Sequence, residues 1–463
     1  MKKWSSLFFL CAFVITSHAA IRLPAVISSN MVLQQQSTVK LWGWCGPGEK
    51  IAITTSWNNK TDTLKGTRDA NWAHSIQTPA AGGPFTITIW GSNTPAPIVL
   101  ENVLIGEVWV CSGQSNMEWN YYNKLPDIAA ELPACYNKNI RFFHIPKTTA
   151  TNPQDDCAAK WTICDSNTLK FFSAVGYFFG KKLNQDLNVP IGLVNSSWGG
   201  TPAEVWTPEA LVNTDAELKT SAAKLKNDSR WPITPGYTYN AMINPIINYG
   251  IAGAIWYQGE SNVEMYDTYG KLFTTMIDSW RKAFNKEIPF YYVQIAPYRY
   301  GANLNGALLR EAQTKAMAHP NTGMVVITDL VADTANIHPT NKHDVGARLA
   351  NWALHNTYKK EGFAYVSPMY KSMEVKKGKA YLSFDNAPTG LIIKGKTATE
   401  VYIAGSDKQW YPAEVKIENN QLVVSNKLVK EPVAVRYSFT NTGVGNLFGK
   451  EGLPVNPFRT DSW

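Results

Sequence analysis

The sequence predicts an α/β protein in which a parallel sheet flanked by helices lies between two β-rich regions. In the middle of the chain, apolar runs bounded by turn residues alternate with longer helical patterns. Strands that are apolar along their whole length are typical of a parallel sheet buried on both faces. Before and after this stretch, apolar and polar residues alternate with period two, which indicates antiparallel strands.

The composition sets the broad class of protein. The chain has 463 residues, of which 44% are hydrophobic and 17% are charged. This is enough apolar material for two or three domains, and it excludes general disorder. The formal charge of +8 is not gathered into any basic run, so we expect no nucleic-acid partner.

The first twenty residues have the order of a secretory signal peptide. Two lysines at positions 2 and 3 precede an apolar stretch from Leu7 to Ile15, and Ser17-His18-Ala19-Ala20 follows. The apolar stretch is too short to cross a bilayer, and no later run is long enough. We therefore expect residues 1–20 to be removed and the protein to be periplasmic or secreted, without a membrane span.

The two β-rich regions flank the predicted α/β core. Residues 21–102 contain alternating runs such as 39–44 and 85–90, and we assign a sandwich-like β region there. Residues 362–463 show the same period-two alternation of apolar and polar residues, and we expect a hairpin turn at Asn419-Asn420.

Residues 103–361 form the predicted core. Its expected strands are 103–111, 190–195, 251–257, 289–295 and 323–328, and its expected helices are 173–187, 269–284, 307–318 and 342–358. Two long insertions, 120–172 and 207–249, receive no complete assignment. Insertions of this kind often shape a binding site.

Five cysteines remain once the leader is removed, so at least one thiol stays free. Cys111 lies in an apolar run and is expected to be a small buried hydrophobe. Cys135, Cys157 and Cys164 fall in one irregular region where an oxidising compartment could form a disulfide, but the sequence does not select a pair. Seven scattered histidines and the absence of metal-binding spacings predict no metal site.

The residues that follow the predicted strands carry the chemistry. In a parallel sheet the ligand site lies at the carboxyl ends of the strands. The segments found there are 112–117, 195–202, 258–262 and 333–339. Together they supply a nucleophile, a base and hydrogen-bond donors.

This set matches the demands of acyl transfer. The hydroxyl of Ser115 needs a neighbouring base to become nucleophilic, and His338 is an imidazole that is neutral near pH 7. The tetrahedral intermediate needs donors for its oxyanion. The backbone N–H groups of Ser115 and Gly200 and the side-chain amide of Asn262 are the candidates.

The four segments resemble a known family. Their order and spacing are similar to the four sequence blocks of SGNH (GDSL-type) hydrolases, and most similar to the sialate O-acetylesterase branch. The matching motifs are Ser-Gly-Gln-Ser-Asn-Met-Glu at 112–118, Trp-Gly-Gly-Thr-Pro at 198–202, Trp-Tyr-Gln-Gly-Glu-Ser-Asn at 256–262 and Ile-His-Pro-Thr-Asn-Lys at 337–342. Residues 31–34 and 452–458 also resemble this branch.

The resemblance implies a flavodoxin-like SGNH-hydrolase sheet and the removal of O-acetyl groups from sialic acids, with acetate as the second product. It assigns Ser115 as nucleophile, His338 as base, and Ser115, Gly200 and Asn262 as the oxyanion hole. It implies no cofactor, and a small-molecule or glycan substrate that carries O-acetyl sialic acid.

One position departs from the family pattern. Many SGNH enzymes place an aspartate three residues before the histidine, and Ala335 stands there in this chain. Either Asp333, the nearest acid upstream, or a backbone carbonyl would have to orient the imidazole of His338. The second alternative makes the site a serine–histidine dyad.

Further residues are candidates for substrate binding. Glu260 lies beside Asn262 and would fix it or line the pocket, and Gln114, Trp198, Tyr257 and Gln258 belong to the same segments. Arg310 could hold a sialate carboxylate through a bidentate contact. An ordinary surface arginine of a helix is the interpretation that we favour slightly.

Three other functions compete with this one. An esterase of acetylated xylan or another glycan would use the same four blocks. An α/β-hydrolase is disfavoured, because Met117 stands where the Gly-x-Ser-x-Gly motif requires glycine. A glycan-binding protein with a degenerate core would lack an activated serine. The sequence does not fix the oligomeric state.

Overall fold

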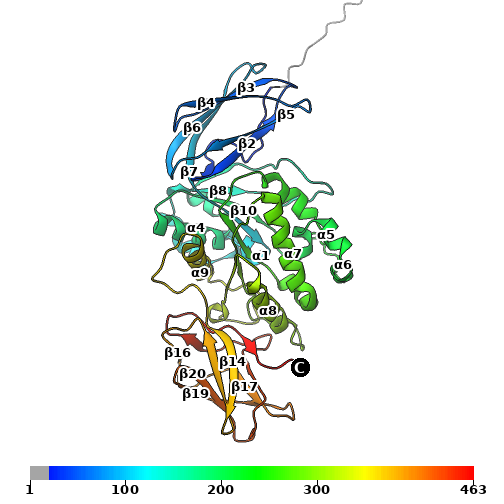
Figure 1. Cartoon of the computed structure of the whole chain (residues 1–463), viewed down its shortest axis with the longest axis vertical. Helices are drawn as coiled ribbons and strands as arrows, with labels where there is room; N and C mark the ends of the chain where they lie inside the picture. Colours follow the sequence, from blue (N-terminus) through cyan, green and yellow to red (C-terminus); the bar gives the residue numbers. More distant parts are fainter. Residues whose placement is uncertain (1–19) are drawn as a thin grey trace, which may run out of the picture.

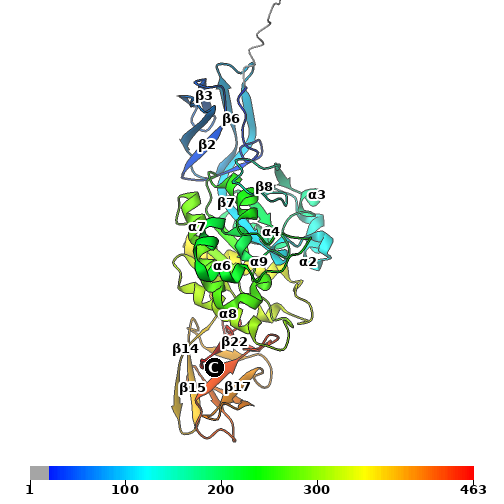
Figure 2. The ribbon, with the colours of Figure 1, turned by 90° about the vertical axis from the view of Figure 1, so that its right-hand side faces the viewer.

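The structure is a computed structural model that describes residues 20–463. A β-rich N-terminal region, a central α/β body and a β-rich C-terminal region follow one another along the long axis (Figure 1). Figure 2 shows the same order from the side. The predicted α/β class is confirmed. The predicted leader covers residues 1–20, of which all but Ala20 lie outside the described residues, and it stays a prediction.

The central sheet has the strand order β13-β12-β11-β7-β10-β8-β9, and only the β8–β9 pair is antiparallel. Its strands are β7 (Ile98–Gly113), β8 (Asn137–His144), β9 (Trp161–Cys164), β10 (Ile191–Ser197), β11 (Gly253–Tyr257), β12 (Phe290–Val293) and β13 (Thr322–Val325). Without the edge pair β8–β9, the order by position in the chain is 2-1-3-4-5, which is the flavodoxin-like order. The edge pair comes from the insertion 120–172, for which the sequence predicted no strand.

Helices cover both faces of this sheet, as predicted. α4 (Ala174–Leu187) packs with α9 (Lys342–Trp352) on one face, and α7 (Tyr266–Phe284) packs with α8 (Asn305–Lys315) on the other. Successive residues of β7 enter opposite cores: Val108 and Val110 belong to the core that contains α7, and Trp109 and Cys111 to the core that contains α4. Cys111 is therefore the buried hydrophobe expected, and burial raises the pKa of its thiol.

Strand β7 is shared between the N-terminal region and the central body. Its first half pairs with β1 (Val32–Gln34) and β6 (Gly82–Gly91), and its second half pairs with β10 and β11. β3 (Lys50–Thr55) and β4 (Lys60–Lys65) extend the first sheet, while β2 (Thr38–Trp44) and β5 (Asn71–Gln77) form a second one. The predicted division between residues 102 and 103 falls inside this continuous strand.

The C-terminal region has its own apolar core, which includes Leu382, Ile403 and Val435. Its larger strands are β14 (Met369–Lys376), β15 (Lys379–Asp385), β19 (Glu414–Glu418) and β20 (Gln421–Ser425) in one antiparallel sheet, and β17 (Val401–Ala404), β18 (Trp410–Pro412), β21 (Ala434–Tyr437) and β23 (Phe458–Arg459) in another. β16 (Leu391–Ile393) pairs with β22 (Leu447–Gly449). Asn419 and Asn420 both have positive φ between β19 and β20, so the expected hairpin turn is confirmed.

The five cysteines of the described chain are all free thiols. Cys164 Sγ donates to the backbone carbonyl of Cys135 at 3.1 Å, so these two residues lie side by side without a disulfide between them. No disulfide forms in the irregular region where the sequence left one open.

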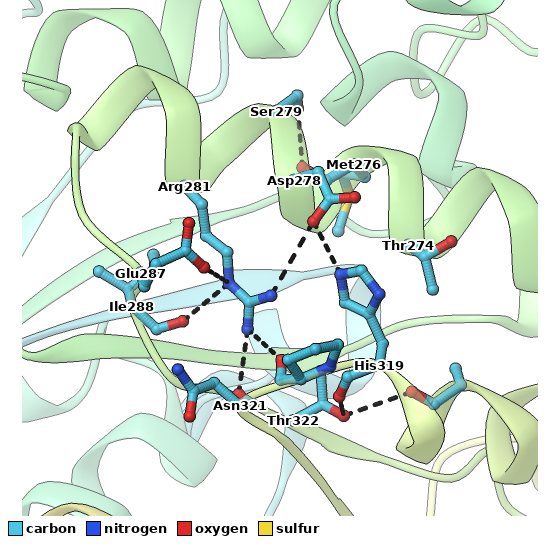
Figure 3. A network of polar contacts seen from close by, with 12 residues as sticks. Thr274, Met276, Asp278, Ser279, Arg281, Glu287, Ile288, His319, Asn321 and Thr322 are labelled. Carbon is cyan, nitrogen blue, oxygen red and sulfur yellow. Dashed lines mark hydrogen bonds and ion pairs between the residues drawn. The ribbon is translucent and has the colours of Figure 1, made fainter.

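Arg281, at the end of α7, joins the helix to the starts of two strands (Figure 3). Its side chain is 4% exposed. Nη2 donates to the carbonyl oxygens of Pro320 at 2.7 Å and Asn321 at 3.2 Å, and Nε donates to that of Ile288 at 3.1 Å. These carbonyls precede β12 and β13, so the guanidinium lies at the amino ends of the parallel strands.

We expect the substitution Arg281→Met to lower the free energy of unfolding by about 3 kcal/mol, because three carbonyls lose a charged donor in a buried place. Chemical denaturation measures this loss. Lys282→Met, at the exposed neighbouring position of α7, is the matched control and should change stability by less than about 0.5 kcal/mol. Equal losses in the two variants would contradict the role given to Arg281.

Candidate active site

Ser115 lies where β7 passes into the short helix α1 (Ser115–Glu118). Gly113 has φ +137° there, and a Cβ on it would lie 2.2 Å from the carbonyl oxygen of Tyr257 on β11. Gln114 N–H donates to that same oxygen at 3.0 Å. Only glycine allows β7 to approach β11 this closely, and the resulting turn presents the Ser115 hydroxyl at the carboxyl edge of the sheet.

His338 reaches Ser115 from the loop that precedes α9. Its Nε2 lies 2.8 Å from Ser115 Oγ. The imidazole stacks on Trp119, with ring centroids 4.0 Å apart. The backbone N–H of His338 donates to Asn336 Oδ1 at 2.9 Å. Burial, and then the charge of Lys342, lower the pKa of His338 to about 4. At neutral pH the imidazole is therefore uncharged and able to accept a proton.

Asp333 does not approach His338. Its side chain is exposed, and Oδ1 accepts the N–H of Ala335 at 2.8 Å. This local turn is typical of an aspartate that bonds to the backbone two residues later. Among residues 20–463 no carboxylate is hydrogen-bonded to His338. The contact that would make Asp333 a third member of the site is absent, and Trp119 is the side chain that holds the ring.

The three candidate oxyanion donors come from three strand ends. Gly200 has φ +83°, and the N–H groups of Gly200 and Ser115 donate to no acceptor among the described residues. The Asn262 amide is fully buried. Its Oδ1 accepts from Ala203 N–H at 2.9 Å and Gln258 Nε2 at 2.7 Å, and its Nδ2 donates to Glu204 Oε2 at 2.9 Å. These contacts fix the amide and leave one of its N–H bonds uncommitted.

Ser115 and His338 line a pocket of about 490 Å³. Its other lining residues are Gln114, Glu118, Trp119, Asn123, Lys147, Trp198, Gly199, Gly200, Arg230, Trp231, Glu260, Ser261 and Ile337. Lys147 and the pair Arg230-Trp231 come from the two insertions that were expected to shape a site. The sequence pointed to these insertions but carried no signal for the individual residues.

The predicted substrate residues divide into two groups. Gln114, Trp198 and Glu260 line the pocket. Tyr257 and Gln258 are fully buried, and neither lines it. They belong to the support of the site.

Arg310 lies away from the pocket, on α8. It is 1% exposed, and its guanidinium donates to the carbonyls of Ser438, Thr440 and Asn441 in the C-terminal region. Arg310 therefore lies neither in the pocket, where it could meet a sialate carboxylate, nor on the surface of its helix, and both interpretations of it were wrong. The sequence could not show this, because its partners are backbone atoms some 130 residues away.

A second cavity differs from this pocket in the residue types that line it. A larger cavity of about 830 Å³ lies where residues 362–366 meet the C-terminal region, but its lining holds no serine, cysteine or histidine.

Within residues 20–463 no group of three or more His, Cys, Asp or Glu side chains is placed to hold a metal ion. No helix in that range is long and apolar enough to cross a membrane.

The chain is similar to known carbohydrate esterases in both sequence and structure. The profile of a family described as "Carbohydrate esterase, sialic acid-specific acetylesterase" matches residues 105–355, more than half of the chain. Sialate O-acetylesterase of Mus musculus is 28% identical over 90% of this chain and 89% of its own length, and that of Homo sapiens is 27% identical over 90% and 87%. A carbohydrate acetylesterase from Xanthomonas citri has a crystal structure that matches with TM-score 0.87 and 35% identity, over 96% of this chain and 100% of that chain.

The fold and these matches define a carboxylic ester hydrolase. The chain belongs to the carbohydrate esterase family of sialic acid-specific acetylesterases. The resemblance found in the four sequence blocks is thereby confirmed.

Gly200 offers a test of the pocket geometry. A Cβ at this position would lie 2.2 Å from two carbon atoms of the Trp231 ring, so Gly200→Ala must displace the ring or the donor N–H. We expect kcat/KM for acetyl ester hydrolysis to fall about 10- to 100-fold. Gly48→Ala is the matched control, because Gly48 also has positive φ (+72°) but nothing within 4 Å. Equal activity of both variants with the unsubstituted protein would remove Gly200 from the site.

Proposed function

We propose that this chain is an exported serine esterase that removes O-acetyl groups from sialic acids and releases acetate. The observation that carries the proposal is the 2.8 Å contact between Ser115 Oγ and His338 Nε2 at the floor of an open pocket. A serine hydroxyl bonded to an uncharged imidazole is an activated nucleophile.

The reaction follows from this geometry. His338 Nε2 takes the hydroxyl proton as Ser115 Oγ bonds to the acetyl carbon, and the donors on Ser115, Gly200 and Asn262 stabilise the oxyanion. The bond to the sugar oxygen then breaks, and that oxygen takes the proton from His338. Water attacks the acetyl-enzyme, gives its proton to His338, and acetate leaves as Ser115 recovers its hydroxyl proton.

The imidazole works without an aspartate in this proposal. The stack on Trp119 fixes the plane of the ring, and the Asn336 contact fixes the backbone of His338. Orientation by packing and backbone contacts supports the dyad that the sequence left open.

The pocket wall supports a sugar as substrate. Trp119, Trp198 and Trp231 give it aromatic faces that suit sugar rings, and Lys147 and Arg230 give it two cations. Lys147 is paired with Glu118, and Arg230 with Asp228, so the wall is polar with little net charge. The mammalian relatives are named for sialate. The Xanthomonas citri protein is named only for carbohydrate, so acetylated xylan is the second candidate.

Export rests on the leader predicted for residues 1–20. Cleavage after Ala20 would leave a chain that begins at Ile21, the residue where the N-terminal β region starts in the sequence prediction. This supports a periplasmic or secreted site of action.

Acetate release tests the substrate. The mature chain is given 9-O-acetylated sialic acid or acetylated xylan at equal acetyl concentration, with Ser115→Ala as the blank. We expect release from the sialic acid, and loss of at least about 1,000-fold in the variant. Preference for xylan would keep the mechanism and replace the substrate. No release from either, together with no labelling of Ser115 by a fluorophosphonate, would favour a glycan-binding protein.

Two substitutions test the dyad. Asp333→Asn should leave kcat within about twofold of the unsubstituted value, because Asp333 bonds only to its own loop. His338→Ala removes the base and should lower kcat by at least about 1,000-fold. A large loss in Asp333→Asn, with thermal stability unchanged, would restore the aspartate to the mechanism.

A further inference from the structure

A buried polar cluster lies directly behind Ser115 and His338. It consists of Lys342 at the start of α9, Asn116 in α1 and Glu260 after β11. Lys342 and Asn116 are both 0% exposed, and Glu260 is 8% exposed. Lys342 Nζ donates to Asn116 Oδ1 at 2.6 Å, and Asn116 Nδ2 donates to Glu260 Oε1 at 2.6 Å. The amide thus bridges a buried ammonium and a buried carboxyl group.

This cluster is connected to both members of the catalytic pair. Asn116 follows Ser115 in the chain, and its Nδ2 also donates to the carbonyl of Ile337, the residue before His338, at 3.1 Å. One side chain therefore ties the serine turn to the histidine loop. The Lys342 backbone N–H donates to Asp127 Oδ2 at 2.7 Å, which holds the start of α9 against α2 (Pro126–Glu131).

The ammonium of Lys342 also lies close to aromatic rings. Its Nζ is 5.6 Å from the ring centroid of Trp119 and 5.4 Å from that of Tyr257, and Trp119 stacks on His338. A cation over an aromatic face is stabilised by the ring, more so where water is excluded. Lys342 thereby contacts the side chain that fixes the plane of the imidazole.

The charge of Lys342 affects the protonation of His338. The titratable groups that face Lys342 are Glu260 from the β11 loop, Asp127 from α2, Tyr257 from β11 and His338 itself. Burial lowers the pKa of Lys342 to about 7, against the opposing effect of Glu260 and Asp127. The positive charge of Lys342 in turn lowers the pKa of His338.

We propose that Lys342, held by Asn116 and Glu260, is a positioning residue for the Ser115–His338 pair: its buried ammonium anchors the histidine loop and opposes a second positive charge on the imidazole. The inference rests on the proposed function, because it takes His338 as the base. It assigns to the last residue of the Ile-His-Pro-Thr-Asn-Lys segment a task separate from substrate contact.

The sign of the charge separates this role from simple packing. In Lys342→Met the positive charge is gone, so we expect the pKa of His338 to rise by about one unit. Activity needs uncharged His338, so the acidic limb of kcat/KM should move to higher pH by the same amount. We expect kcat to fall at least about tenfold, with KM within about twofold. In Glu260→Gln, which removes the negative partner, kcat should fall without any rise in the pKa of His338.

The experiment measures kcat, KM, the pH profile and the NMR titration of the His338 ring, which is assigned by its loss in His338→Gln. Lys286→Met is the matched control: its ammonium donates to the Ile251 carbonyl at 2.8 Å, at the opposite edge of the sheet. This variant should keep the activity and the His338 titration of the unsubstituted protein. An unchanged pKa in Lys342→Met, or a rise of the same size in Lys342→Met and Glu260→Gln, would overturn the inference.

Failure of the proposed function has a different signature. It would appear as acetate release that survives Ser115→Ala, or as no release by the unsubstituted chain. The NMR titration of His338 does not depend on turnover, and it still decides whether Lys342 acts on the imidazole. Melting temperatures of the variants show whether a loss of kcat comes from unfolding.

Discussion

The close approach of β7 and β11 at Gly113 is the constraint on which the site depends. The two strands are buried and pair in parallel, with Tyr257 opposite Gly113, so a Cβ at Gly113 would clash with the Tyr257 carbonyl of the paired strand. The Ser115 turn and the Glu260–Asn262 loop leave the sheet from these two adjacent strands. Their separation is set by strand pairing, which leaves the loops little freedom to vary it.

The second constraint is the absence of a carboxylate at the histidine. His338 is held between the Ser115 hydroxyl and the ring of Trp119, with no acid bonded to it in the described chain. A stacked ring fixes orientation but does not stabilise an imidazolium as an aspartate would. The Asn262 amide, which we propose as an oxyanion donor, is in contrast fixed by hydrogen bonds to three neighbours.

The sequence predicted the parts of the molecule that depend on local pattern. Five core strands and four helices follow from apolar periodicity, and the contact of Ser115 with His338 follows from their positions after strands of one sheet. Arg310 was not predictable, because its environment is made by carbonyls of a distant loop. The aromatic and charged pocket wall was likewise hidden, since the path of the long insertions is decided by packing against other elements.

The sharing of β7 has a consequence for how the chain folds. Of the partners of its first half, β6 ends seven residues before β7 begins, whereas β1, β10 and β11 lie about 60, 80 and 140 residues from β7 along the chain. Closing short loops costs less entropy than closing long ones. We therefore expect the N-terminal region to form early and to present the second half of β7 as a ready-made template. The catalytic sheet would then grow outward from a strand whose position its neighbour has already fixed.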